Sequence, residues 1–182
     1  MSGEREFPTN PERSEEPLGP SLTLPATAIN MRQGEAFPEV FCRSRRKYVK
    51  LEPEEWVRQH WLAYLTDGLG YPAGLVAVEC PLKLNGMKRR ADIVCHNRAG
   101  KPILMVECKA PEISLDEKVY QQAARYNMVL QVPVLVISNG IQHHALQFFK
   151  DRMPQFLMTI PSFSELESPG ATGREASWNG SE

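Results

Sequence analysis

The sequence predicts a small α/β or α+β domain whose mixed β-sheet is flanked by helices, in the order α-β-β-β-α-β with one optional further strand. Three observations predict it. Stretches with a helical apolar pattern, 51–70 and 113–130, lie on either side of alternating apolar runs in 74–110. The dipeptide Asn85-Gly86, a strong hairpin signal, divides those runs. A continuous apolar run, VPVLVISNG, follows the second helical stretch.

The first helix has a clear start, face and end. Pro53 suits the first helical position, where its missing N–H is not needed. Val57, Trp61 and Leu65 fall on one stripe, which predicts the buried face. Gly68 ends the pattern.

The remaining elements follow from period and turn chemistry. Ser114 and Glu117, three residues apart, predict a capping box at the start of the second helix. The strands are expected at 75–83, 88–96, 102–109, 132–140 and, as an edge strand, 142–149.

Composition predicts one folded unit between two tails. Residues 1–40 and 161–182 are rich in polar residues and carry net charges of −4 and −3, so we expect disordered tails. Residues 41–160 carry +6 and form the expected domain, and their basic excess fits a polyanion partner. No apolar run approaches the length of a membrane span and no secretory signal is evident, so we expect a cytoplasmic protein without a membrane partner. The four cysteines form no CxxC pair and are expected as free, mostly buried thiols.

Charged residues interrupt the apolar strands at one place. Period two puts Glu107 and Lys109 on the same strand face, and an antiparallel hairpin brings Asp92 beside them. Two close carboxylates repel each other, and a hard cation such as Mg²⁺ relieves this. These residues therefore predict a metal site with a lysine that positions water or stabilises charge on phosphorus. The alternative is a buried ion pair that only holds the sheet together.

Three further polar residues each allow two interpretations. Gln122 and Tyr126 lie four residues apart on the apolar stripe of the second helix. Either both reach the metal site, or Gln122 points to solvent at the margin of the stripe and Tyr126 is a core residue. Glu79, on the first strand, is either a further acid near the metal or a surface residue.

The pattern AD-x14-ECK, followed by QAARY, resembles the PD-(D/E)xK nuclease superfamily. Residues 41–150 are most similar to the N-terminal nuclease domain of type I restriction-enzyme R subunits, in its stand-alone bacterial version. The similar segments, in order, are RKYVKLEPEEWVRQHWLAYL, GYP, KLNGMKRRADI, VECKAP and ISNG. The resemblance implies a restriction-endonuclease-like core.

The resemblance also implies roles for individual residues. Asp92, Glu107 and the backbone carbonyl of Cys108 would bind Mg²⁺, for which Mn²⁺ is expected to substitute. Lys109 would be the catalytic lysine. Gln122 and Tyr126 match a QxxxY element beside the active site. Ala91 stands where the superfamily name has proline, a position that does not touch the chemistry.

Basic clusters suggest how DNA would be held. We expect backbone phosphate contacts, without sequence preference, from Lys83, Lys88, Arg89 and Arg90 around the hairpin, and from Arg45, Arg46 and Lys47 before the first helix. His143 and His144 lack a third ligand at useful spacing and are expected at a strand-edge surface.

The sequence thus predicts a Mg²⁺-dependent deoxyribonuclease. Asp92→Ala and Lys109→Ala are expected to abolish cleavage and to leave the fold intact. The alternatives are a catalytically silent nucleic-acid-binding module and a subunit of a larger restriction, repair or helicase complex. The sequence contains no GxxxxGK[ST] loop, so we expect no coupling of ATP to DNA translocation by this chain itself.

Overall fold

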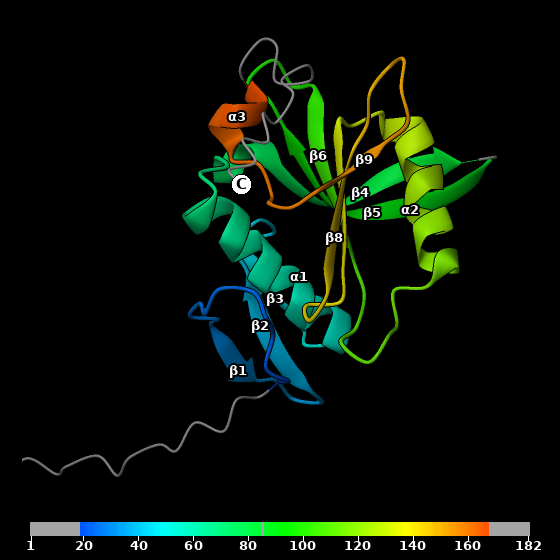
Figure 1. Ribbon diagram of the computed structural model, residues 1–182. Helices are drawn as coiled ribbons and strands as arrows, with labels where there is room; N and C mark the ends of the chain where they lie inside the picture. Colours follow the sequence, from blue (N-terminus) through cyan, green and yellow to red (C-terminus); the bar gives the residue numbers. More distant parts are fainter. Residues whose placement is uncertain (1–18, 85, 168–182) are drawn as a thin grey trace, which may run out of the picture.

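The computed structural model describes residues 19–84 and 86–167, in which one helix lies between two β-sheets (Figure 1). The first sheet has the order β1-β2-β3 and the second has the order β4-β5-β6-β7-β8-β9. The strands are β1 (Met31–Gln33), β2 (Pro38–Cys42), β3 (Lys47–Lys50), β4 (Val76–Leu84), β5 (Met87–His96), β6 (Pro102–Cys108), β7 (Val134–Ser138), β8 (His143–Gln147) and β9 (Gln155–Leu157). The helices are α1 (Pro53–Ala63), α2 (Glu117–Leu130) and α3 (Phe163–Glu167), with short turns η1 (Tyr64–Gly68) and η2 (Ala73–Leu75).

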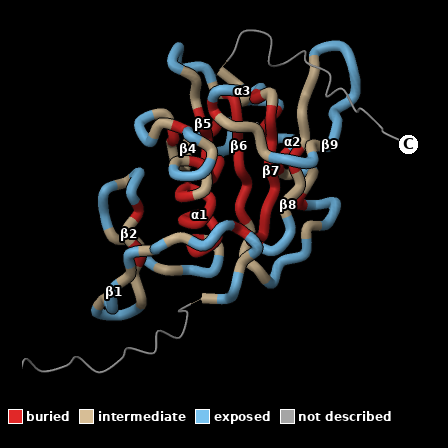
Figure 2. The backbone as a smooth tube through the Cα atoms, turned by 60° about the vertical axis from the view of Figure 1, so that its left-hand side comes forward, coloured by how far each residue is buried: buried red, intermediate tan, exposed pale blue. Residues whose placement is uncertain are grey.

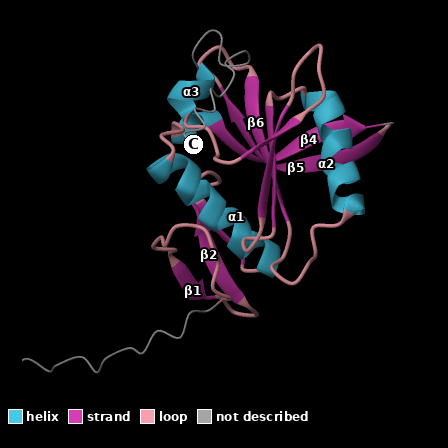
Figure 3. Ribbon diagram, in the orientation of Figure 1, coloured by secondary structure: helices cyan, strands magenta, loops and turns pink. Residues whose placement is uncertain are grey.

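The six-stranded sheet is mixed and has a helix on each side. Only β6 and β7 pair in parallel among its described neighbours, and α2 provides the crossover between them. The apolar residues of α1 pack on one face of the sheet and those of α2 on the other (Figure 3). The mixed α/β fold is therefore confirmed, and it is compatible with a restriction-endonuclease-like core.

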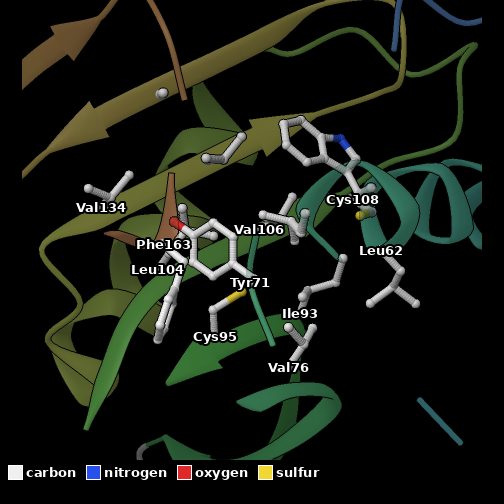
Figure 4. Packing of buried hydrophobic residues seen from close by; sticks show 14 of the residues in the cluster. Leu62, Tyr71, Val76, Ile93, Cys95, Leu104, Val106, Cys108, Val134 and Phe163 are labelled. Atoms are coloured by element: carbon white, nitrogen blue, oxygen red, sulfur yellow. The ribbon is translucent and has the colours of Figure 1, made fainter. Parts of the chain in front are cut away.

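The central strands carry the core. Buried residues run along β6, β7 and α1 (Figure 2), and both faces of β6 are covered. On the α1 side, Leu104 packs in a cluster with Val106, Val134 and Phe163 (Figure 4). This burial explains why β6 and β7 read as continuous apolar runs in the sequence.

The substitution Leu104→Ala tests this core. Leu104 is 0% exposed, so its loss leaves a cavity and is expected to lower the free energy of unfolding by about 2–5 kcal/mol. Urea unfolding followed by circular dichroism measures the change. Met128→Ala on α2 is the control, because Met128 is 75% exposed and its truncation should change stability by less than about 0.5 kcal/mol. Equal losses for the two variants would contradict this packing.

Helix α1 begins at Pro53, as predicted, but it is buried on nearly every side. Val57, Trp61 and the Leu65 that follows the helix face the six-stranded sheet. The opposite side lies against the three-stranded sheet (Figure 1), so residues 55–63 are all buried. Polar residues that a solvent-facing helix would expose are therefore enclosed in this protein.

The start of α2 differs from the prediction. The cap is Asp116, whose Oδ1 accepts hydrogen bonds from the backbone N–H groups of Lys118 and Val119, at 3.0 and 3.2 Å. The helix begins at Glu117, so Ser114 lies outside it and the predicted capping box is wrong. A carboxylate directly before the first turn satisfies the same free donors and suits the positive end of the helix dipole.

The expected tails are shorter than predicted where the structure describes them. Residues 19–40 contain β1 and the start of β2, Leu24 is buried, and the Thr23 amide donates to the Gly140 carbonyl at 2.9 Å. Helix α3 lies within the expected C-terminal tail and buries Phe163. Residues 1–18 and 168–182 lie outside the described residues, as does Asn85 of the predicted turn, whereas Gly86 adopts the positive φ of 78° that such a turn requires.

The cysteines agree with the expectation of free, mostly buried thiols. All four cysteines are free, and Cys42, Cys95 and Cys108 are buried. Across 19–84 and 86–167, no helix combines the length and the apolar character that a membrane crossing requires.

Candidate functional site

Two acids lie next to each other where β5 and β6 stop pairing. Ile93 of β5 is opposite Val106 of β6 in the antiparallel register, so Asp92 and Glu107 occupy the next positions outward. Both are buried, with 9% and 2% of their surface exposed. The hairpin thus brings together the two carboxylates that the sequence places 15 residues apart.

Glu107 is held on the α2 side of the sheet. Its Oε1 accepts hydrogen bonds from Lys109 Nζ at 2.8 Å and from Gln122 Nε2 at 2.7 Å. Its Oε2 is buried and has no hydrogen-bond partner among the residues that the structure describes. Burial, followed by repulsion from Asp92, raises the pKa of Glu107 to about 7 against the attraction of Lys109.

The cation and the amide around Glu107 come from two different elements. Lys109 follows the end of β6. Burial lowers its pKa, but Glu107, Asp92 and Glu54 together raise it above the usual value, so the ammonium stays charged. Gln122 lies on α2 and also donates to the Tyr126 hydroxyl at 3.3 Å. Gln122 therefore points to the acid pair and not to solvent, and Tyr126 lies beside it.

Asp92 is fixed by two donors. Its Oδ1 accepts from Arg58 Nη2 at 2.7 Å, and its Oδ2 accepts from the backbone N–H of Cys108 at 2.8 Å. Arg58 lies on α1 and is also ion-paired with Glu54 and Glu55. Burial opposes the charge of Arg58, but Asp92 and Glu55 hold its pKa above the usual value.

Glu79 is ion-paired with Arg45, and the contacts of these two residues bear on two expectations. Glu79 Oε2 lies 2.9 Å from Arg45 Nη1, and its Oε1 lies 3.8 Å from Arg90 Nη1. A positive φ of 49° at Glu79 accompanies this arrangement. Arg45 is 18% exposed and also contacts Glu55, so it is enclosed by protein carboxylates and is not a free phosphate contact. In the described part of the chain, no hydrogen bond or ion pair joins Glu79 to Asp92 or Glu107.

The hairpin cations gather in one groove. Pro81 and Leu82 of β4 and Gly86 of the turn line the groove together with four cations. The cations that line it are Lys83, Lys88, Arg89 and Arg90. Arg46, on the turn between β2 and β3, and Lys47, the first residue of β3, are also exposed.

His143 and His144 are paired with protein groups. The His143 ring nitrogens lie 2.7 Å from Ser138 Oγ and 2.8 Å from Thr23 Oγ1. The His144 ring is stacked against that of Tyr120. Both histidines are partly buried in these contacts, and β8 pairs with β7 and β9, so the expected edge strand is wrong. Within the residues that the structure describes, they belong to no group of three potential metal ligands.

The chain carries the sequence pattern of a known family. Residues 53–161 match the family described as the N terminus of the type I restriction enzyme R protein. The chain belongs to this family. The match runs from the first residue of α1 to beyond β9 and includes both acids, Lys109 and Gln122.

A solved structure is also similar to part of the chain. The chain is similar to the fragment structure of a putative HsdR subunit of a type I restriction enzyme from Vibrio vulnificus YJ016, with 22% identity and a TM-score of 0.48. That similarity covers 64% of this chain and 24% of the other, so this chain spans less than a third of that structure. No curated protein matches the chain.

The acid pair of this R-protein N-terminal domain has the donor atoms of a small cation site. Within residues 19–84 and 86–167, no three His, Cys, Asp or Glu side chains are grouped as metal ligands. The donor set still fits Mg²⁺, which binds through one or two carboxylates and keeps several waters. The buried, unpartnered Oε2 of Glu107 is an acceptor that a cation would satisfy, and burial together with Asp92 also raises the pKa of nearby Glu54.

Arg58 and its carboxylate partners are the functional candidates that sequence reasoning missed. Glu54 and Glu55 lie four and three residues before Arg58, a spacing that indicates local ion pairs on a helix. That spacing does not indicate burial or a contact with Asp92, because both depend on how α1 packs between the two sheets.

Proposed function

We propose that this chain is a metal-dependent deoxyribonuclease of the PD-(D/E)xK type, which hydrolyses DNA phosphodiester bonds. Asp92, Glu107 and Lys109 would form its active site. The observation that carries this proposal is the buried pair of carboxylates with an ammonium 2.8 Å from one of them and a free buried oxygen on the same side chain. A pair that served stability alone would not leave that oxygen unpartnered, since an unsatisfied buried polar atom is costly.

Mg²⁺ would be held by the carboxylates of Asp92 and Glu107 and by the backbone carbonyl of Cys108. When bound, Mg²⁺ supplies polarisation of a phosphoryl oxygen and a lower pKa for an attacking water. We expect Mn²⁺ to substitute, because its ligand preferences are similar.

The chain's own side chains would orient the reactants. The Lys109 ammonium, kept charged by Glu107, would stabilise negative charge that develops on the phosphoryl oxygens. Gln122 holds Glu107 Oε1 at 2.7 Å and would fix the direction of its free Oε2. The Tyr126 hydroxyl, beside Gln122, would donate to a water or a phosphate.

The basic groove would hold the DNA backbone. Replacing Lys88 and Arg89 together by alanine should weaken binding of any DNA sequence and lower the slope of log K against log salt by roughly 2. Fluorescence anisotropy at several salt concentrations measures this. Lys101→Ala with Lys150→Ala is the charge-matched control, because both lysines are exposed and lie outside the groove. An equal change in slope for the control would contradict a specific role of the groove.

A larger assembly is the context that we propose for this domain. The family description names the N terminus of a type I restriction R protein, and the similar Vibrio structure is titled as an R subunit of such an enzyme. By this relation, other subunits of a restriction complex would be partners of the chain in addition to DNA.

A metal-dependence assay on several nucleic acids tests the proposal. Purified protein is incubated with supercoiled plasmid, single-stranded circular DNA and RNA, each with Mg²⁺, with Mn²⁺ and with excess EDTA. We expect nicking or linearisation of DNA with either metal and none in EDTA. Cleavage that persists in EDTA, or intact DNA under every condition, would overturn the proposed function.

A further inference from the structure

A buried network of alternating charges links the turn after β2 to Asp92. Arg45 Nη2 lies 2.6 Å from Glu55 Oε1, Glu55 Oε2 pairs with Arg58 Nη1, and Arg58 Nη2 lies 2.7 Å from Asp92 Oδ1. The four residues, which we term the α1 charge network, have two positive and two negative charges. Their side chains are between 7% and 18% exposed.

The network is more elaborate than stability requires. Burying ion pairs removes hydration from both partners, so such pairs seldom stabilise a fold more than apolar residues of similar size. Glu55 is further held by Gln59, whose Nε2 donates to Oε1 at 2.7 Å. Arg58 Nε is buried without a partner among the described residues, which is a further cost of placing this guanidinium here. A role other than stability explains better why these charges are buried.

The contacts of Asp92, at the end of the network, indicate a role in orienting this carboxylate. Arg58 on one oxygen and the Cys108 amide on the other hold the Asp92 carboxylate from both sides, which fixes its rotation. Each carboxylate oxygen can accept a second interaction, so both remain able to contact a cation. Groups that orient a metal ligand in this way commonly change metal affinity or activity by 10–100-fold when removed.

We infer that Arg58 is a positioning residue that sets the orientation of Asp92, and that Glu55 in turn positions Arg58. The inference rests on the proposed metal site and adds residues of α1 to it. It places the control of the carboxylate in the helix that the three-stranded sheet covers, outside the hairpin that carries the acids.

The sign of one measurement separates positioning from a simple effect of charge. A guanidinium beside the ligand repels a cation, so charge alone predicts tighter metal binding when Arg58 becomes glutamine. Loss of orientation predicts weaker binding. A merely structural role predicts a lower melting temperature with an unchanged metal affinity in the protein that remains folded.

The experiment titrates Mn²⁺ into the full chain by isothermal calorimetry, with no DNA present. Arg58→Gln should raise the dissociation constant for Mn²⁺ by about 10–100-fold, and Arg58→Lys should restore part of the loss. Glu55→Gln, which keeps the Arg58–Asp92 pair, should weaken binding by a smaller factor and serves where Arg58→Gln does not fold. Arg43→Gln is the control, because Arg43 is paired with Asp67 at an exposed site and should leave the affinity unchanged.

The outcomes are distinguishable. Wild-type protein that binds Mn²⁺, together with folded Arg58→Gln or Glu55→Gln protein that binds it as tightly or more tightly, would overturn the inference and leave the proposed function standing. Wild-type protein that neither binds Mn²⁺ nor cleaves DNA would overturn the proposed function and the inference with it.

Discussion

Replacing Lys109 by alanine is expected to slow Mg²⁺-dependent DNA cleavage by about 10²–10³-fold or more. The Lys109 ammonium lies 2.8 Å from Glu107 Oε1 and is the charge that the proposed mechanism sets against the developing negative charge on phosphate. Single-turnover nicking of supercoiled plasmid measures the effect. Lys101→Ala is the control, since this exposed lysine lies at the other end of β6 and should cleave like the wild type.

Lys109 gives a clearer test than Asp92. The sequence alone leads one to expect that Asp92→Ala abolishes cleavage without affecting the fold. In the structure, Asp92 is a counterion of the buried Arg58, and removing one partner of a buried pair commonly costs about 3–5 kcal/mol. Lys109 is 16% exposed, and its partner Glu107, whose pKa is raised to about 7, can bind a proton when the ammonium is removed, so the Lys109 variant should remain folded. Wild-type cleavage rates in folded Lys109→Ala protein would contradict the proposed role.

The second large effect is expected for Glu107→Gln, which should abolish cleavage and change how stability depends on pH. The pKa of Glu107 is raised to about 7 by burial and by Asp92. A carboxyl whose pKa is higher in the folded than in the unfolded protein binds more protons when folded, so stability falls as the pH rises from about 4.5 through 7. Glutamine does not titrate, so the variant does not lose this stability as the pH rises.

The melting temperature of Glu107→Gln, relative to the wild type, should therefore increase between pH 5 and pH 8 when both are measured in EDTA. The exposed Glu112→Gln is the matched control and should show a difference that does not vary with pH. A constant difference for Glu107→Gln as well would show that this carboxyl is not destabilised by its surroundings. Retained cleavage would contradict its place in the site.

Local rules were sufficient for the hairpin that carries the two acids and the lysine. Period two along β6 and the antiparallel register with β5 are properties of neighbouring residues, so they place Asp92, Glu107 and Lys109 together before any tertiary packing is known. Spacing also puts Gln122 and Tyr126 one helical turn apart on α2, but it left open whether they reach the acids, because that depends on how α2 packs on the sheet.

The α1 side of the site could not be predicted in this way. Arg58 is buried because α1 lies between two sheets, and β1 and β3 are only three and four residues long, too short for a reliable periodic pattern. Arg45 reads as a free cation of a basic cluster until its partners Glu55 and Glu79, far apart in sequence, are seen beside it. These contacts depend on long-range packing and not on local spacing.

The location of a bound cation tests the central claim most directly. Crystals of the protein soaked in Mn²⁺ would be measured near the manganese absorption edge, and an anomalous difference map would locate the ion. The account predicts one strong peak within coordination distance of Glu107 Oε2 and the Asp92 carboxylate. A peak elsewhere, with none between these two side chains, would contradict it.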